Sequence, residues 1–568
     1  MSPRRLLFRH FLRQLASFEA ASTGGEAKYV IIAVVSLLAG PGYLAAVAAA
    51  RGSRWLALSH EGRMPPELWL WKQEWLLLAV SLVTISVLVA VQWRSFVLDG
   101  RDYRILGLLP IRRRTVMSAK LQSLAAVVLL LHVAINTLPG LWLPVASPFG
   151  YVRAAFALQA ALLMQTVFAC CAIVALQGMV SLVLPAGAAR RVSLALQALV
   201  LLAAALLFVA EGSISRLAFA MRDAAHPVNW IVPVVWFRAL YLELLGVDSA
   251  LLAAQARVAL LATAGALAAA LPCSLLGYRD ASGEVRHGGG GLAASRLGAV
   301  LDGGRARPVA RAVSFFVEAA LLRSASAGLI ARGFFVVGAA LTLSGLIGLV
   351  LRDIGYSAPV LPARPLHAPA FVLPFFALVG LRLAAVYPAS LEANWLFRLT
   401  EAPGSADYAA GIRRAAQRAV VLPLLALLAV PYAFLWGPIA AAAHLALALL
   451  VALVTVEWLF AGFPKVPFTC TYQPGKANLR VTWPRHAAIF VVYCGLLPSL
   501  AARVEAHPVP YALTLGLLLV VWRWLVRRRV RQARSSRLVF DDAAAPSLTV
   551  LDLEWRERAD RRAAARPA

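Results

Sequence analysis

Acidic residues and long polar segments are scarce in this sequence. Its 568 residues include 27 Asp and Glu against 55 Lys and Arg, and charged residues make up only 14% of the chain. Soluble domains carry about 25% charged residues, so this composition excludes an ordinary soluble protein. The five cysteines fall in apolar segments or on the side predicted below to be cytosolic, which argues against a disulfide framework.

Signatures of catalysis are also missing. His60-Glu61 is not followed by the second histidine of HExxH, no nucleophile elbow stands out, and no Cys/His cluster has metal-ligand spacing. The Gly475-Lys476 pair lacks the rest of a phosphate-binding loop, with Cys470 in place of the first glycine. We therefore expect a chain that is not an enzyme, binds no cofactor or metal, and cannot itself hydrolyse ATP.

What the sequence does contain is a series of apolar blocks. Hydrophobic residues make up 61% of the chain, its mean hydropathy is +0.75, and blocks of about 20 residues can cross roughly 30 Å of hydrocarbon. The blocks are continuous rather than alternating, which favours helices over a barrel. The predicted fold is an all-α, polytopic helical membrane protein with about twelve transmembrane helices. The candidate spans are 29–50, 75–93, 121–146, 154–184, 193–210, 250–277, 334–351, 369–388, 419–436, 439–463, 487–502 and 509–522.

The net charge of +28 is explained by the membrane rather than by nucleic acid. If the N-terminus is cytosolic, most Lys and Arg lie in cytosolic loops, as the positive-inside rule requires. Both termini are then cytosolic, and we expect a bacterial-type cytoplasmic (inner) membrane with lipids as neighbours. No cleavable signal peptide is visible, because the apolar region after the basic start is too long.

A Gly- and Arg-rich stretch divides the chain into two halves. We expect a first six-span transmembrane half at 1–277, a flexible cytosolic linker at 278–311, a second six-span half at 312–526 and a basic cytosolic tail at 527–568. Each half begins with a basic amphipathic segment, at 4–18 and 315–324, suited to lie along the cytosolic leaflet.

The two halves also share short matches. The pattern S-x-G-x-x-A-[K/R] occurs at 22–28 and 326–332, and Asp102-Tyr103 returns at nearly the same spacing as Asp407-Tyr408. We interpret these matches as an internal duplication, for which chance similarity in an apolar sequence is the alternative.

The loop at 97–120, VLDGRDYRILGLLPIRRRTVMSAK, is the most polar connection in the first half. Apolar residues recur at helical spacing from Tyr103 to Leu109, and Pro110 then stops or kinks the helix. A short helix with exposed apolar residues between two spans can dock into a groove on another protein. A solvated basic connector is the alternative.

This loop and its surroundings resemble the permeases of type-2 ABC exporters, best over residues 1–277. Shared features are the amphipathic basic N-terminal helix, the acidic residue, Leu-Leu-Pro and basic run of the loop, the short outer connection after the third span, and an aromatic re-entrant segment before the sixth. The resemblance implies a coupling helix that docks on a separate ATPase subunit, a dimer that binds ATP and Mg²⁺. The implied contact residues are Asp99, Asp102, Tyr103, Leu108, Leu109 and Pro110.

The second half departs from this pattern. Its counterpart loop keeps Asp407 and Tyr408 and a basic run, but it lacks Leu-Leu-Pro. The resemblance therefore leaves open whether both halves engage the ATPase. The proline-rich loop at 463–485 is expected to be either a second docking surface or a structural turn.

Polar residues inside the predicted spans are candidates for a transport path, because burying them is costly. These residues are His132, Asn136, Arg382, His444 and Glu457. Glu457 is expected to pair with a basic residue near the cytosolic end of its span. Ordinary hydrogen bonds between helices are the alternative reading of the whole set.

The predicted function is therefore the permease subunit of an ATP-binding-cassette exporter, moving an amphipathic or hydrophobic substrate. Two alternatives remain open. A membrane-embedded lipid- or glycan-modifying transferase would need an outward-facing cluster of acids or histidines, for which Glu61, Glu67 and His226 are only scattered candidates. An ion-coupled carrier would need buried acidic residues, and the spans supply few.

Overall fold

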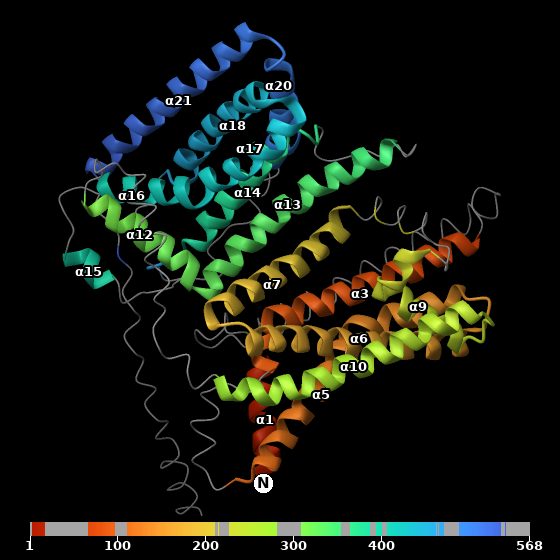
Figure 1. The fold of residues 1–568 in the computed structure, drawn as a ribbon. Helices are drawn as coiled ribbons and strands as arrows, with labels where there is room; N and C mark the ends of the chain where they lie inside the picture. The colour runs from red at the N-terminus through yellow and green to blue at the C-terminus, as the bar shows by residue number, and fades with distance from the viewer. Residues whose placement is uncertain are drawn as a thin grey trace, which may run out of the picture. The chain divides into compact units, whose positions relative to one another are not determined.

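The structure is a computed structural model in which every regular element of the described residues is helical (Figure 1). The described residues are 3–16, 66–96, 111–210, 214, 218, 226–280, 308–353, 364–386, 394–399, 406–461, 463, 465–470, 488–535 and 540. Within them, nine helices are long and apolar enough to cross a membrane, and two shorter apolar helices follow at Pro369–Ala384 and Ala488–Val504. The prediction of an all-α membrane protein is confirmed. The expected span at 29–50 lies outside the described residues, so the count of twelve stays a prediction.

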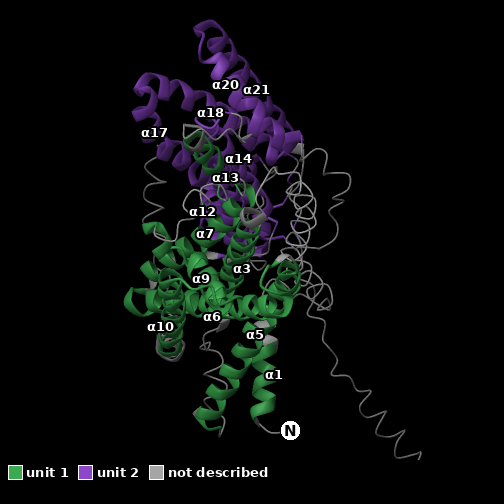
Figure 2. Ribbon diagram, turned by 90° about the vertical axis from the view of Figure 1, so that its right-hand side faces the viewer, with its two compact units in different colours: residues 1–290, 343–360 green, residues 291–342, 361–568 purple. Residues whose placement is uncertain are grey.

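The chain divides into two compact units (Figure 2). Unit 1 comprises residues 1–290 and 343–360, and unit 2 comprises residues 291–342 and 361–568.

Unit 1 is organised around the long helix α6 (Tyr151–Val183), against which five other α-helices pack. Its other elements are α1 (Pro3–Ala16), α3 (Pro66–Phe96), α5 (Arg113–Trp142), η2 (Leu143–Ala146), α7 (Ala186–Val209), η3 (Pro227–Trp230), α9 (Pro233–Leu244) and α10 (Ala250–Asp280). The closest seam joins α6 to α10, where a Cβ on Gly178 would lie only 2.5 Å from Cys273 Cβ. Glycine at that position lets the two backbones approach, as is common between membrane helices.

The segment that the sequence predicts to be re-entrant forms the short helices η3 and α9 before α10. Trp236 donates its indole N–H to the carbonyl of Trp230, which closes the turn between the two short helices. Arg238 of α9 bonds Glu74 of α3 at 2.9 Å and lies over the Trp71 ring. Because Glu74 is 3% exposed, this ion pair fixes α9 against α3 from inside the unit.

Unit 2 is organised around α18 (Pro438–Leu459), which packs against helices on three sides. Its other elements are α12 (Pro308–Arg323), α13 (Ala325–Asp353, whose residues from 343 are grouped with unit 1), α14 (Pro369–Ala384), α15 (Asn394–Leu399), α16 (Ala406–Ala416), η6 (Gln417–Val421), α17 (Leu422–Trp436), η7 (Val492–Leu496), α20 (Leu497–Val504) and α21 (Pro508–Ser535). The elements η6 and η7 are π-helical turns within longer helices.

Proline and glycine set several helix boundaries in unit 2. Proline is the first residue of α12, α14, α18 and α21, where its missing N–H would be unsatisfied in any case. Between α17 and α18, Gly437 adopts φ +82°, a conformation that favours glycine and reverses the chain in a single residue. These two helices therefore form a tight antiparallel hairpin.

The two units share one packing relationship near their starts. In unit 1 the amphipathic helix α1 lies along the beginning of α5, and in unit 2 α12 lies along α16 (Figure 1). The amphipathic segments expected at 4–18 and 315–324 correspond to α1 and α12.

Candidate functional site

The residues implied to contact an ATPase in the first half lie outside the described residues. These are Asp99, Asp102, Tyr103, Leu108, Leu109 and Pro110. The structure resumes at Ile111, and α5 begins at Arg113. Their role stays a prediction.

The segment that follows this loop is held by α1. Leu7 and Phe11 are buried against Ala119, and the Lys120 ammonium lies 4.9 Å from the centre of the Phe11 ring. Arg4 donates a hydrogen bond to the Gln122 side chain at 3.2 Å. The apolar face of α1 therefore packs on protein at the start of α5, while its arginines at positions 4, 5 and 9 stay exposed.

The corresponding connection in unit 2 contains the short helix α15. Its Phe397 is 7% exposed and packs edge-on against Phe316 of α12 and Tyr408 of α16, with ring centres 5.1 and 6.1 Å away. Trp395 and Leu399 of the same helix are 62% and 75% exposed. The helix thus has one anchored aromatic residue and a large apolar surface turned away from its unit.

Asp407 and Tyr408 occupy different environments at the start of α16. Asp407 lies in the first helical turn, where the helix dipole stabilises a negative charge. Tyr408 is 2% exposed, and its hydroxyl donates to the Phe397 carbonyl at 3.5 Å. Within unit 2, Tyr408 therefore supports α15 from behind.

The described part of the proline-rich loop is a buried structural turn. Val466, Phe468 and Cys470 are at most 1% exposed, and the Phe468 amide donates to the Ala385 carbonyl at the end of α14. Asn394 of α15 donates to the Thr469 carbonyl at 3.0 Å. This segment therefore joins the end of α14 to the beginning of α15, and the remainder of the loop, 471–485, lies outside the described residues.

Arg382 secures the same region. Its Nε donates to the carbonyl of Leu459, the last residue of α18, at 3.0 Å, and its guanidinium lies 4.4 Å from the Phe463 ring centre. A cation at a helix C-terminus satisfies a carbonyl that has no helical partner. The sequence placed Arg382 among candidates for a transport path, and the structure gives it this capping contact.

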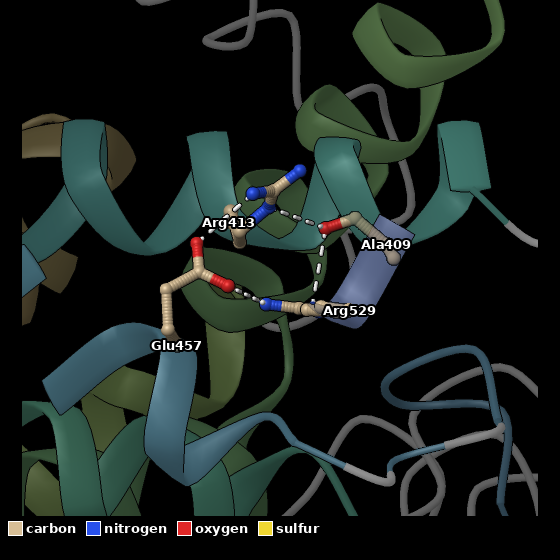
Figure 3. Close-up of polar contacts among 4 residues, drawn as sticks. All are labelled: Ala409, Arg413, Glu457 and Arg529. Carbon is tan, nitrogen blue, oxygen red and sulfur yellow. Dashed lines mark hydrogen bonds and ion pairs between the residues drawn. The ribbon is translucent and has the colours of Figure 1, made fainter. Parts of the chain in front are cut away.

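Glu457 lies between two arginines from different helices (Figure 3). One carboxylate oxygen accepts from Arg413 Nη1 of α16 at 2.9 Å, and the other accepts from Arg529 Nη1 of α21 at 3.1 Å. Both arginines also donate to the Ala409 carbonyl. The Glu457 side chain is 1% exposed, so the cluster joins α16, α18 and α21 through a desolvated network with a surplus of one positive charge.

His444 belongs to a second polar cluster in unit 2. Its Nδ1 lies 2.8 Å from Glu505 Oε1, and the other Glu505 oxygen lies 3.9 Å from His367 Nε2. His444 is fully buried and is surrounded by the rings of Phe371, Tyr432 and Trp436 at 5.0–5.4 Å between centres.

His132 and Asn136 form a small network inside unit 1. The Asn136 amide donates to the Thr166 hydroxyl at 3.1 Å and lies 3.3 Å from His132 Nδ1. Gln159 donates to the carbonyls of Asn136 and Thr137. These bonds join α5 to α6, which fits the reading as ordinary helix-to-helix contacts.

Several members of these clusters were not singled out by the sequence. Glu505, His367 and Arg529 become neighbours of Glu457 or His444 only through packing between segments 61 to 77 positions apart. The exposed apolar surface of α15 had a detectable signal in the sequence NWLFRL, an aromatic and apolar run inside a polar loop. In the part of the chain that the structure describes, no group of three or more His, Cys, Asp or Glu could hold a metal ion.

Comparison with protein families, with curated proteins and with solved structures finds no match for this chain.

Proposed function

We propose that this protein is the membrane-spanning permease subunit of an ATP-driven exporter, with twelve helices in two six-span halves that arose by duplication. A separate ATPase dimer drives it from the cytosolic side. The substrate is amphipathic or hydrophobic, because charged side chains inside the described spans are mostly paired with one another or with backbone carbonyls.

The observation that carries this proposal is how α15 packs, with one buried aromatic residue and an exposed apolar surface. It lies in the connection between α14 and α16, the place in the second half that corresponds to the 97–120 loop of the first half. Its Phe397 is locked between α12 and α16 while Trp395 and Leu399 are exposed. A rigidly anchored helix with an apolar outer surface can transmit a push from a partner to the helices behind it.

The mechanism follows from the contacts behind α15. Phe397 touches α16 through Tyr408, and α16 is joined to α18 and α21 through the Glu457 cluster. A displacement of α15 by the ATPase therefore reaches three helices through packed and hydrogen-bonded neighbours. In the second half, α15 makes the contact with the ATPase, and Asp407 and Tyr408 at the start of α16 support α15.

The transferase alternative gains little from the histidines of unit 2. A general base must lie within hydrogen-bond reach of its substrate. The imidazole of His444 is 0% exposed and enclosed by aromatic rings, so a substrate has no access to it in this conformation.

The test is recovery of an ATPase with the full-length protein from its native membrane in mild detergent, identified by mass spectrometry. We expect a chain with a phosphate-binding loop to copurify with the wild type and to be lost from the variant Trp395→Asp/Leu399→Asp. The matched control is Phe434→Asp/Leu435→Asp on α17, which is equally exposed in unit 2 but lies at the predicted outer end of its span. Absence of any ATPase from the wild type, with a known transporter kept intact in the same extract, would refute the proposal.

A further inference from the structure

Glu505 and the two histidines beside it come from three separate segments of unit 2. His367 lies in the turn just before α14, His444 lies in α18, and Glu505 directly follows α20. The His367 and His444 rings are 5.4 Å apart between centres and nearly perpendicular. The single Glu505 carboxylate therefore contacts two imidazoles, and its one negative charge can balance a positive charge on only one of them.

His444 has one ring nitrogen bonded to Glu505 and one without a partner. When its Nδ1 carries the hydrogen that bonds Glu505, its Nε2 is a buried acceptor with no hydrogen-bond partner. Leaving such an atom unsatisfied is unfavourable. The bond from His444 therefore occupies one oxygen of Glu505, and His367 faces the other oxygen.

His367 lies where burial and its neighbours oppose its protonation. Burial lowers its pKa below the usual range, the nearby His444 and Arg364 lower the pKa further, and only Glu505 acts in the opposite direction. Its ring packs against Trp436 at 4.7 Å and its side chain is 24% exposed. A charged His367 is therefore disfavoured in its packed position and favoured in water.

The remaining groups near the cluster do not supply a second anion. Arg503 and His507 flank Glu505 and are exposed, and Arg364 is exposed on the segment that carries His367. On α17 and α21 the nearby titratable groups are the phenols of Tyr432 and Tyr511, the second of which donates to the Ala443 carbonyl.

We propose that His367, His444 and Glu505 form a proton-operated latch. At neutral pH the latch holds residues 364–368 against α18 and the end of α20. In acid, His367 takes a proton and leaves its packed position, while His444 stays against Glu505. The segment before α14 is released, which frees the beginning of that helix to move. The latch is independent of which ATPase or substrate the protein uses.

Hydrogen exchange of the full-length protein in lipid nanodiscs tests this latch. The readout is the exchange rate of a peptide containing residues 364–368, at pH 8 and pH 5.5, after correction for the intrinsic chemical rate. The amides of His367 and Ala368 both donate to the Arg364 carbonyl in the latched turn, so they report its integrity. We expect the wild type to exchange severalfold faster at pH 5.5 than at pH 8, up to about tenfold, because a released imidazole of ordinary pKa is mostly charged at pH 5.5.

Three variants make the outcome specific. His367→Gln cannot be protonated and stays protected at both pH values, whereas Glu505→Gln removes the anion and exchanges fast already at pH 8. His226→Gln, which changes a partly exposed histidine of unit 1, behaves as the wild type. The proposal is overturned if the corrected wild-type rates agree at the two pH values, or if His367→Gln shows the same acid release; these two results decide the matter even if Glu505→Gln does not fold.

Discussion

Glu457 and Arg529 stand 72 positions apart in the sequence and meet through a 3.1 Å hydrogen bond in which the guanidinium donates to Oε2. Arg413 occupies the other carboxylate oxygen. Because two cations share one anion, the three side chains are not equivalent. Removing the anion leaves two buried positive charges, whereas removing one arginine leaves a neutral pair.

This asymmetry predicts an order of stabilities. Glu457→Gln should destabilise the protein by about 3–5 kcal/mol, the magnitude expected when a buried charge loses its partner. Arg413→Gln should cost clearly less, because Arg529 still binds the carboxylate. Melting temperatures of the purified variants in one detergent check this order, and equal losses for the two variants would contradict it.

Close packing of α12 on α16 predicts a large effect for one added methyl group. A Cβ on Gly411 would lie 2.6 Å from the Ala310 carbonyl oxygen and 2.7 Å from Val313 Cβ, so the helices must separate. Gly411→Ala should lower stability by about 1–3 kcal/mol through overpacking. Gly333→Ala in α13 is the control, since a Cβ there meets open space, and it should be neutral or stabilising by up to about 1 kcal/mol. Both are read from thermal melting.

The six residues of α15 should divide into structural and surface positions. Phe397→Ala removes a buried ring that contacts two helices and should cost about 3–5 kcal/mol. Trp395→Ala, two positions away and largely exposed, should stay within about 0.5 kcal/mol. A thermal melt of each variant distinguishes them. If Trp395→Ala were as damaging as Phe397→Ala, α15 would not present a free apolar surface.

A pH dependence is expected from Glu318 in α12. Burial raises the pKa of this carboxyl above its usual range, against a hydrogen bond from Ser314 that lowers it. A raised pKa means that the folded state binds the proton more tightly, so this stabilising contribution is present below the unfolded-state pKa and is lost as pH rises through the folded-state pKa. Glu318→Gln should therefore melt above the wild type at neutral pH and approach it in acid. A difference in melting temperature that is constant from pH 4 to pH 7 would exclude this coupling.

Helices were the predictable part of this fold. Long apolar runs such as those of α6 and α18 determine a spanning helix by length and composition alone, and the faces of α1 and α12 follow from helical periodicity. The pairing of Glu457 with basic residues was also expected. The arginines that bind it could not be named, because Arg413 and Arg529 reach the carboxylate through the packing of three helices.

The contacts of Glu505 could not be predicted from the sequence. Its position just after a predicted span gives no indication that His367 and His444 meet it, since His367 precedes α14 and His444 lies within α18. For α15 the run NWLFRL is compatible with a helix, but the division between Phe397 and Trp395 depends on where α12 and α16 lie. Sequence patterns report the environment of one segment, whereas these sites are made by several.

The π-helical turn at Gln417–Val421 separates two sections of one continuous helix from Ala406 to Trp436. Before the turn the helix carries Arg413 and Arg414, and after it α17 carries no charged residue. A wider turn holds about one extra residue, which rotates every later side chain by about 100° relative to an uninterrupted α-helix. The direction in which Arg413 and Arg414 point is therefore not the direction that an uninterrupted α-helix would give relative to the apolar side chains of α17. Deleting a single residue between 417 and 421 would bring the two faces back into phase, so a one-residue change in length here would turn the whole of α17 about its own axis.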